Sequence, residues 1–445
     1  MSGLLKVPIN EGVAMKYQVL VYPNITYARD LEKDSYIVVV REMIRHLNNV
    51  RSDLHFIMLL PEHVDSLDMP NVEQVTYSLP TYPNTMRAHF DTRAFLTAIN
   101  WKYRNIDIVW SHLPEHMLAM KNVLYNATNE RPPIVGYCHW WEVPENTGYA
   151  ETMLWHNLAG MLAMDYCGVN SEWVKQLVLD HANRRLSWQA IMALGEIIQP
   201  QYLGTDPTYL SDAYPEPGRI IFNHRPNEYT GFNWACQQFD RLWERRQDFK
   251  VGFTMADVDK PWAFRIDAPT RDDYLDELAR SWIGVGTFKR YSAWSVSVMD
   301  GLGMCLPYVL PRGFCYPEMV GDNYSLLYDP REFMPTLERA LNMSMTTRLD
   351  MAHTVRTVAE SYEWSRRITP YSDMFHRAIA SLTHATVTTP TYARVRALAL
   401  EGKTKNEIMR AMSWTGPRVP FGQYREALRR EGIGLTEEYE QLSLV

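Results

Sequence analysis

The sequence has few cysteines and no long apolar run. Its five cysteines are odd in number, widely separated and never arranged as CxxC: Cys138, Cys167, Cys236, Cys305 and Cys315. This spacing argues against a disulfide framework and a cysteine zinc site, and it favours reduced thiols in a cytosol. No window approaches the ~18 uncharged apolar residues of a membrane-spanning helix. The first residues lack an apolar stretch followed by a small-residue cleavage site, so we expect a cytoplasmic protein without a membrane partner.

An excess of positive charge is also missing. The formal net charge is −7, which argues against a protein that coats nucleic acid. The charge is unevenly distributed, because residues 391–432 hold nine Lys and Arg against four Asp and Glu. The rest of the chain therefore carries −12. This asymmetry predicts a small basic module attached to an acidic body.

The length and the apolar pattern predict more than one core. The chain has 445 residues, and single cores stop growing near ~250–300 residues. Strand-like and helix-like segments alternate on both sides of a loop rich in Pro, Gly, Asp and Tyr, Gln199–Gly218. Such alternation is typical of parallel sheets covered by helices on both faces. We predict an α/β protein with two doubly wound Rossmann-like domains, 1–205 and 206–365, then a crossover helix and linker, 366–388, and a small all-α domain, 389–445.

Three polar side chains follow a short apolar strand at the start of the second domain. Asn223, His224 and Arg225 come directly after Ile220–Phe222, at the carboxyl end where doubly wound sheets bind ligands. The planar guanidinium of Arg225 suits two-point binding of phosphate oxygens. An interdomain salt bridge is the alternative role for Arg225. His224 is expected to be structural, and Asn223 to tie the loop backbone.

A histidine ends an apolar strand of the first domain. His139 follows Pro133–Cys138 and precedes Trp140, Trp141 and Glu142. A lone histidine at such a place is more often a core residue, but the strand end favours a contact with a ligand hydroxyl. The sequence His112–His116 and the pair Asp180-His181 contain metal-ligand types without a third group, so no obligatory metal is expected.

Two carboxylates of the second domain require partners. Asp300 lies in a helix of mostly apolar and small residues, so it must be paired or hydrogen-bonded. An internal ion pair, with Arg312 as the candidate partner, is one solution, and a ligand is the other. Glu318 follows Tyr-Pro, where a turn with a helix cap is an alternative to a ligand contact.

Together these motifs resemble the GT-B glycosyltransferases, in particular the retaining family-4-like group. Asn223-His224-Arg225 is similar to that group's NHR-type loop, and Tyr274–Pro330 to its main signature. In the first domain, GYCHWWEVPE and GVNSEW are similar to the group's histidine-tipped strand and "NSE" strand end. The similarity spans residues 16–380. The signature positions are Asp300, Gly303, Pro307, Val309 and Glu318.

The resemblance implies a nucleotide-sugar substrate, most simply UDP-glucose, and a retaining mechanism. It assigns Asn223, Arg225, Asp300 and Glu318 to the donor site and matches His139 to the histidine at the tip of the acceptor-domain strand. From its position, Glu142 is our candidate acceptor-side base, and the predicted catalytic residues are His139, Glu142 and Arg225. Two positions depart from the pattern. Ser292 replaces an acidic residue and Thr230 replaces a lysine, for which Lys289 and Arg290 are candidate substitutes.

The basic C-terminal segment predicts three short helices. They cover 391–400, 404–412 and 421–430, and Thr404 with Glu407 forms a capping box. This arrangement resembles a helix-turn-helix domain, with the third helix as the recognition element. A helical bundle that packs on the body or forms a dimer is the alternative. The predicted DNA-contacting residues are Arg418, Gln423, Tyr424 and Arg425.

A sugar transferase joined to a DNA-binding module implies a DNA acceptor. We expect double-stranded DNA carrying a 5-hydroxymethylpyrimidine, as for bacteriophage DNA glycosyltransferases, with the base flipped into the site. Tyr137, Trp140 and Trp141 are the predicted stacking partners. A tRNA-modifying glycosyltransferase is one alternative, and a DNA-binding regulator that senses a nucleotide sugar is another.

Overall fold

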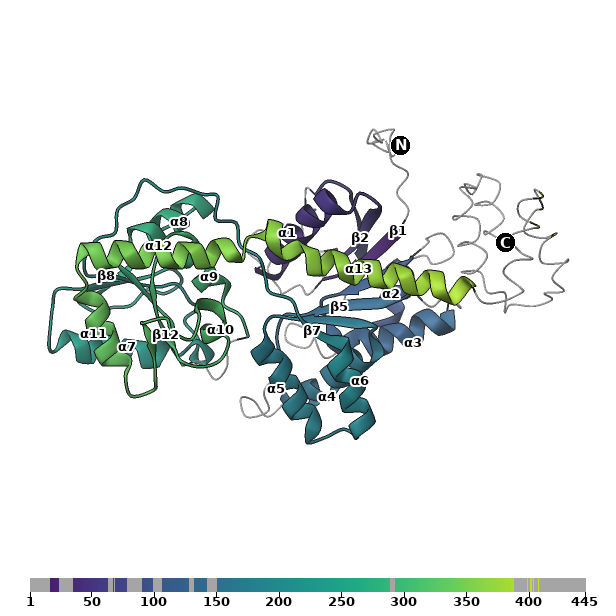
Figure 1. The fold of residues 1–445 in the computed structure, drawn as a ribbon, viewed down its shortest axis with the longest axis horizontal. Coiled ribbons are helices and arrows are strands. Elements are labelled where there is room, and N and C mark those ends of the chain that lie inside the picture. The colour runs from purple at the N-terminus through teal and green to yellow at the C-terminus, as the bar shows by residue number, and fades with distance from the viewer. Residues whose placement is uncertain are drawn as a thin grey trace.

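The fold consists of two parallel sheets with their helices, connected by a linker and by a long returning helix (Figure 1). The computed structural model describes residues 17–23, 35–62, 67, 69–77, 90–98, 106–127, 132–141, 150–288, 293–387, and the isolated positions 398, 401, 403 and 407. We call the first sheet with its helices the first domain, and the second sheet with its helices the second domain.

The first sheet is entirely parallel and has the order β3-β2-β1-β4-β5-β6-β7 within the described residues. Its inner strands are buried almost completely, as expected for a sheet covered on both faces. The strands are β1 (Tyr17–Tyr22), β2 (Leu54–Pro61), β3 (Val72–Tyr77), β4 (Ile108–Ser111), β5 (Ile134–Cys138), β6 (Tyr166–Val169) and β7 (Ile198–Pro200).

Short capping signals begin two helices of the first domain. The Ser171 hydroxyl accepts a hydrogen bond from the Val174 backbone at the start of α5, and Ser187 caps α6 in the same way. The helical elements are α1 (Ser35–Val50), α2 (Thr92–Ala98), η3 (Pro114–His116), α3 (Met117–Ala127), α4 (Ala150–Ala163), α5 (Glu172–Asn183) and α6 (Trp188–Ile197).

The second sheet is also parallel, with the order β10-β9-β8-β11-β12-β13. Two parallel Rossmann-like sheets were predicted and are confirmed. The capping box predicted at Thr270 is also present, since Thr270 and Asp273 bond each other's backbone at the start of α8. The strands are β8 (Arg219–Phe222), β9 (Lys250–Phe253), β10 (Ala263–Arg265), β11 (Ile283–Val285), β12 (Tyr308–Pro311) and β13 (Leu327–Tyr328).

The helices of the second domain lie on both faces of this sheet (Figure 1). They are η4 (Glu228–Thr230), α7 (Phe232–Trp243), α8 (Arg271–Arg280), α9 (Val296–Gly303), α10 (Tyr316–Val320), α11 (Phe333–Leu341) and α12 (Met345–Ser361). The chain then returns to the first domain through α13 (Trp364–Val387), which crosses that domain's sheet (Figure 1). Tyr371 and Phe375 of α13 are buried in the core of the first domain.

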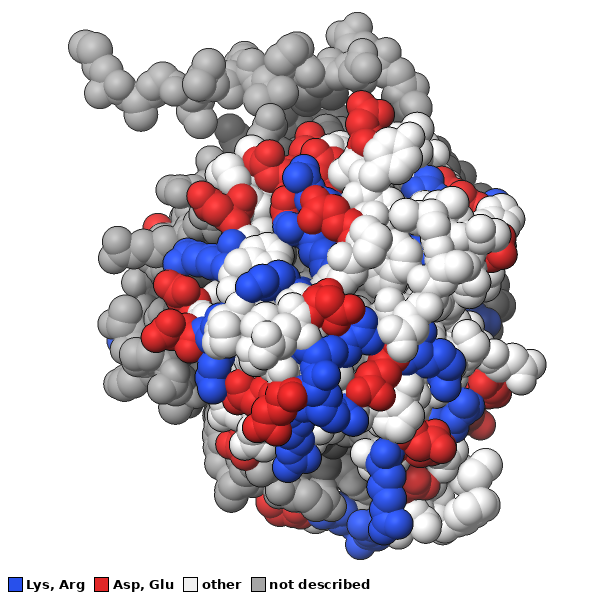
Figure 2. All heavy atoms as spheres, turned by 90° about the vertical axis from the view of Figure 1, so that its left-hand side faces the viewer, with Lys and Arg blue, Asp and Glu red and all other residues white. Residues whose placement is uncertain are grey.

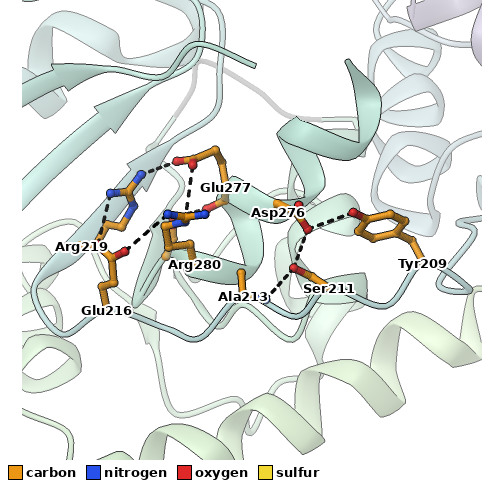
Figure 3. Close-up of polar contacts among 9 residues, drawn as sticks. Tyr209, Ser211, Ala213, Glu216, Arg219, Asp276, Glu277 and Arg280 are labelled. Atoms are coloured by element: carbon orange, nitrogen blue, oxygen red, sulfur yellow. Dashed lines mark hydrogen bonds and ion pairs between the residues drawn. The ribbon is translucent and has the colours of Figure 1, made fainter. Parts of the chain in front are cut away.

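The linker between the domains is attached to α8 by polar contacts (Figure 3). The Tyr209 and Ser211 hydroxyls both donate hydrogen bonds to the Asp276 carboxylate, at 2.9 and 2.6 Å. Farther along, Arg219 at the start of β8 contacts both Glu216 and Glu277. The linker therefore follows the second domain before entering its first strand.

The predicted helix-turn-helix over 389–445 lies outside the described residues, apart from four isolated positions. Among the helices of the described part, none combines the length and the apolar content that crossing a membrane requires.

Candidate functional site

The carboxyl edges of the two sheets face each other. Trp140, which follows β5, makes an edge-to-face contact with Tyr229, which follows β8, at 5.9 Å between ring centroids. Ser171, which follows β6, donates a hydrogen bond at 3.1 Å to the Ala293 carbonyl of the second domain. Ligands of doubly wound sheets bind at such edges, so the candidate site lies between the domains.

The loop after β8 is held by its own side chains. The Asn223 amide donates hydrogen bonds to the Tyr274 hydroxyl at 2.9 Å and to the Ser297 carbonyl at 2.8 Å. His224 lies 3.0 Å from the Ser297 hydroxyl through Nδ1 and packs edge-to-face on Phe222. Both Asn223 and His224 are buried, and their side-chain contacts join the loop to α8 and α9.

Thr230 and Gly231 close this loop. The Thr230 hydroxyl lies 2.7 Å from the carbonyl oxygens of both Arg225 and Asn227. Gly231 has φ +71, and a Cβ built there would lie 2.5 Å from the Thr287 hydroxyl. A side chain at position 231 would therefore be strained and crowded. Thr230, which stands where the GT-B pattern has a lysine, thus helps to hold the loop backbone.

Arg225 differs from its two neighbours because it is exposed. Within the part of the chain that the structure describes, its guanidinium forms neither an ion pair nor a side-chain hydrogen bond. The alternative of an interdomain salt bridge is therefore not seen. A cation without a partner at the carboxyl edge of a parallel sheet is available to an anionic ligand.

Asp300 is paired, but with Arg271 instead of Arg312. The two Arg271 nitrogens donate to the two carboxylate oxygens at 2.9 and 2.6 Å. The alternative prediction that Arg312 is the ion-pair partner of Asp300 was wrong, because the Arg312 guanidinium pairs with the Asp329 carboxylate at 3.8 Å. The side chain of Asp300 is 11% exposed and that of Arg271 is 60% exposed. Burial opposes ionisation of Arg271, but the Asp300 carboxylate outweighs it and raises the pKa of Arg271 above its ordinary value.

Tyr274 links this ion pair to the loop after β8. Its ring lies beneath the Arg271 guanidinium at 5.3 Å, and its hydroxyl accepts the hydrogen bond from Asn223. Burial raises the pKa of Tyr274, and the Asp300 carboxylate adds to this effect. Sequence reasoning missed Arg271 and Tyr274. The capping box at Thr270 placed Arg271 in the first turn of a helix, but it carried no signal that this turn faces α9.

Glu318 contacts the first domain. Its carboxylate accepts hydrogen bonds from the backbone of Glu172 at 2.7 Å and Trp173 at 3.2 Å, in the first turn of α5. The Tyr202 hydroxyl donates to the same carboxylate at 2.6 Å. The sequence offered a local helix cap as the alternative role, but α10, which contains Glu318, has no side-chain cap hydrogen bond. Glu318 instead accepts from the first turn of a helix of the other domain. Burial and the Glu318 carboxylate together raise the pKa of Tyr202.

His139 lies at the carboxyl end of β5 beside a second histidine. His112, which follows β4, places its Nδ1 atom 2.8 Å from Nε2 of His139. The Tyr36 ring of α1 contacts His139 edge-to-face at 5.2 Å. Burial, together with the neighbouring His139, holds the pKa of His112 well below its ordinary value. The sequence placed His112 in a weak metal-ligand motif and gave no signal for this pairing.

Two of the three aromatic residues predicted to stack on a base are in the core. Tyr137 and Trp141 are fully buried. The Tyr137 hydroxyl donates to the Gln201 carbonyl at 2.8 Å, and Trp141 Nε1 donates to His181 at 3.0 Å. In this structure neither ring has a face open to a flipped base. Trp140 is only partly buried and remains at the domain interface.

Several predicted site residues lie outside the described residues, so their positions are not discussed. They are Glu142, Lys289, Arg290, Arg418, Gln423, Tyr424 and Arg425. Among the residues that are described, no group of three or more His, Cys, Asp or Glu side chains is arranged to hold a metal ion.

Charge is mixed on the outer end of the second domain. Figure 2 shows Lys and Arg interspersed with Asp and Glu on this face. Ion pairs of this domain include Arg246 with Asp248 and Lys260 with Asp240. The described residues of this face therefore form no continuous basic stripe of the kind that is typical of nucleic-acid-binding surfaces.

The fold is similar to that of several solved sugar-phosphate synthases, although no family model and no curated protein matches the sequence. An α,α-trehalose 6-phosphate synthase from Burkholderia multivorans has a TM-score of 0.62 and 13% identity, over 84% of this chain and 100% of that chain. Sucrose-phosphate synthase from Thermosynechococcus elongatus has a TM-score of 0.63 and 10% identity, over 82% of this chain and 100% of that chain.

A structure from E. coli, described as trehalose-6-phosphate bound with UDP-2-fluoro glucose, has a TM-score of 0.56 and 13% identity. The match covers 80% of this chain and 98% of the E. coli chain. At this level of identity the similarity establishes the fold, which is GT-B: two parallel Rossmann-like sheets whose carboxyl edges face each other.

Proposed function

We propose that this protein is a glycosyltransferase that uses a nucleotide sugar. The observation that carries the proposal is Arg225, an exposed cation without an acidic partner among the described residues, on a loop fixed at the carboxyl end of β8. The GT-B fold supplies the setting, since one solved structure with this fold is described with UDP-2-fluoro glucose. UDP-glucose is accordingly the donor we propose.

The chemistry explains why a fixed cation is useful at this position. Transfer of the sugar breaks its bond to the diphosphate, and negative charge grows on the leaving oxygens. A guanidinium held there stabilises the transition state more than the ground state, which lowers the barrier. Asn223 and Thr230 hold the loop, so the backbone that carries Arg225 has little reorganisation to undergo. With this cation, and with Lys289 and Arg290 as further candidates, the proposal requires no metal.

Asp300 and Glu318 have distinct places in this proposal. Asp300 is proposed to accept hydrogen bonds from ribose hydroxyls, because a carboxylate paired with one arginine retains lone pairs for other donors. Glu318 is proposed to lie beside the sugar while it connects the domains. His139 and Glu142 are proposed for the acceptor side, and retention of configuration is the proposed stereochemical outcome.

The acceptor we propose is a hydroxyl group on a modified base of DNA, such as a 5-hydroxymethylpyrimidine. The support is the local charge of residues 391–432 and their resemblance to a helix-turn-helix segment. The comparisons with solved structures do not bear on the acceptor. Because Tyr137 and Trp141 are buried, Trp140 is the only one of the three predicted stacking residues that we retain for a flipped base.

One experiment separates this function from its alternatives. The full-length protein is incubated with radiolabelled UDP-glucose in three separate reactions. The acceptor is duplex DNA containing 5-hydroxymethylcytosine in the first, unmodified DNA in the second and tRNA in the third. Label transferred only to hydroxymethylated DNA supports the proposal, and label in tRNA supports a tRNA-modifying transferase. Tight binding of UDP-glucose with neither transfer to an acceptor nor hydrolysis supports the sensing regulator.

A further inference from the structure

His112 and His139 meet through two ring nitrogens at the ends of neighbouring strands. The nitrogens are 2.8 Å apart, whereas the ring centroids are 5.0 Å apart and the ring planes differ by 25°. The rings therefore approach corner to corner and lie nearly in one plane. That is the geometry of an in-plane N–H···N hydrogen bond, which requires one proton between the two nitrogens.

The surroundings of His112 decide which ring supplies this proton. His112 is 1% exposed and His139 is 7% exposed. The low pKa of His112 makes it neutral near pH 7, so it carries a single ring proton. Its other nitrogen, Nε2, is buried and has no hydrogen-bond partner among the residues that the structure describes. Two arrangements are possible for such a ring, and they differ in cost.

If His139 donated to Nδ1 of His112, the single proton of His112 would lie on Nε2, as a buried N–H without an acceptor. If His112 donates through Nδ1, its Nε2 atom is left only with an unused lone pair. Among backbone groups, orphaned buried N–H donors are rarer than under-used acceptors, and we take the same order of cost to hold for these ring nitrogens. The second arrangement is therefore the more stable one, and His139 accepts the hydrogen bond through Nε2.

We propose that His112 is a positioning residue that fixes the tautomer of His139, with the His139 proton on Nδ1. This inference rests on the proposed glycosyl transfer. With Nε2 engaged and Nδ1 protonated, neutral His139 has no lone pair with which to remove a proton. Any sugar or acceptor oxygen that binds its ring accepts a hydrogen bond from Nδ1. His139 then polarises or orients a hydroxyl group, and the general base is a different residue.

Two substitutions at position 112 separate positioning from packing. His112→Asp places an acceptor-only carboxylate near Nε2 of His139, so it should move the proton of His139 to Nε2. His112→Phe retains a flat ring but has no hydrogen-bonding nitrogen, so His139 should populate both tautomers. His156, which is exposed on α4, provides a control, because His156→Gln should leave the His139 signals unchanged.

The tautomer is read by two-bond ¹H–¹⁵N correlation NMR of the full-length protein labelled at its 13 histidines. The His139 signals are identified by their loss in His139→Gln. The expected wild-type pattern is protonated Nδ1 with unprotonated Nε2, and His112→Asp should invert it. A wild-type pattern with the proton on Nε2 would overturn the proposal. The wild-type spectrum decides the question even if a position-112 variant fails to fold.

Kinetics with UDP-glucose provide the second measurement. His112→Phe should lower kcat by about 10-fold to 100-fold, the range known for residues that orient metal-bound histidines, with little change in KM for the nucleotide sugar. An unchanged kcat in a folded His112→Phe protein would show that the tautomer does not matter for transfer. If the wild type shows the expected tautomer but no transfer or hydrolysis, the proposed function fails and the histidine assignment stands.

Discussion

Removal of the Glu318 carboxylate should release the contact between the two domains. In the structure this carboxylate accepts two backbone hydrogen bonds from the first turn of α5 and a third from the Tyr202 hydroxyl. A negative charge at a helix N-terminus is also favourable because of the helix dipole. Glu318→Ala removes all three acceptor contacts and this charge, whereas Glu318→Gln keeps one oxygen and loses the charge.

The size of the effect follows from the exposure of the contact. Hydrogen bonds to charged groups contribute about 1.5–3 kcal/mol each when they are buried. Here Glu172 is exposed and Trp173 is only partly buried, so water replaces part of what is lost. We therefore expect Glu318→Ala to destabilise the contact between the domains by about 2–4 kcal/mol in total. Since about 1.4 kcal/mol is a factor of ten, the arrangement with the domains in contact should lose about 30-fold to 1000-fold in relative population.

Small-angle X-ray scattering measures this effect as a larger radius of gyration for Glu318→Ala than for the wild type, with Glu318→Gln between them. Glu332, an exposed residue at the start of α11 whose side chain makes no cap hydrogen bond, supplies the matched control Glu332→Ala. Donor turnover should fall in the same order as the scattering changes. If Glu318→Ala scatters and turns over UDP-glucose like the wild type, Glu318 does not hold the domains together.

Three further predictions concern the rest of the site. Asp300→Asn should weaken UDP binding, measured by calorimetry. Its free energy of unfolding should change by less than about 1 kcal/mol, because the partner Arg271 is mostly exposed. Equal weakening of UDP binding by Arg271→Ala would mean that only the ion pair matters. Gly231→Ala forces a side chain at φ +71 and should cost about 1–2 kcal/mol in urea unfolding. Gly195→Ala should not, because a Cβ there would meet only Leu179 Cδ2, at an ordinary contact distance of 4.0 Å. Because the pKa of His112 is lowered on folding, the stability it contributes is complete above the unfolded pKa of about 6.5 and declines as pH falls below it, by about 1.4 kcal/mol per pH unit; a His112→Phe protein with the same pH slope would contradict this.

Local signals explain the parts of the fold that the sequence predicted well. The strand before Asn223 and the capping box at Thr270 are defined by neighbouring residues, and both were found as predicted. Alternation of strands and helices likewise indicated two parallel sheets. The carboxyl end of β8 stays the predicted place for a site, because strand direction in a parallel sheet determines which edge is open to a ligand.

Contacts between distant segments explain what the sequence did not predict. Tyr137 was expected to face a base, but α13 covers that side of the sheet, and Tyr371 stacks on Tyr137 at 6.0 Å. These residues are separated by more than half of the chain. The partner of Asp300 was also misassigned, since the choice between Arg271 and Arg312 depends on how α8 packs against α9. Hydrophobic periodicity carries no information on such pairings.

The central claim is tested most directly by donor turnover with and without the Arg225 guanidinium. UDP release from UDP-glucose is measured for the wild type, for Arg225→Ala, and for Arg331→Ala, which removes another exposed arginine of the second domain. The wild type and Arg331→Ala should release UDP at similar rates, and Arg225→Ala should be slower by about 10²-fold to 10³-fold with an unchanged melting temperature. Equal rates for Arg225→Ala and the wild type, or no UDP release by the wild type with any acceptor, would contradict the account.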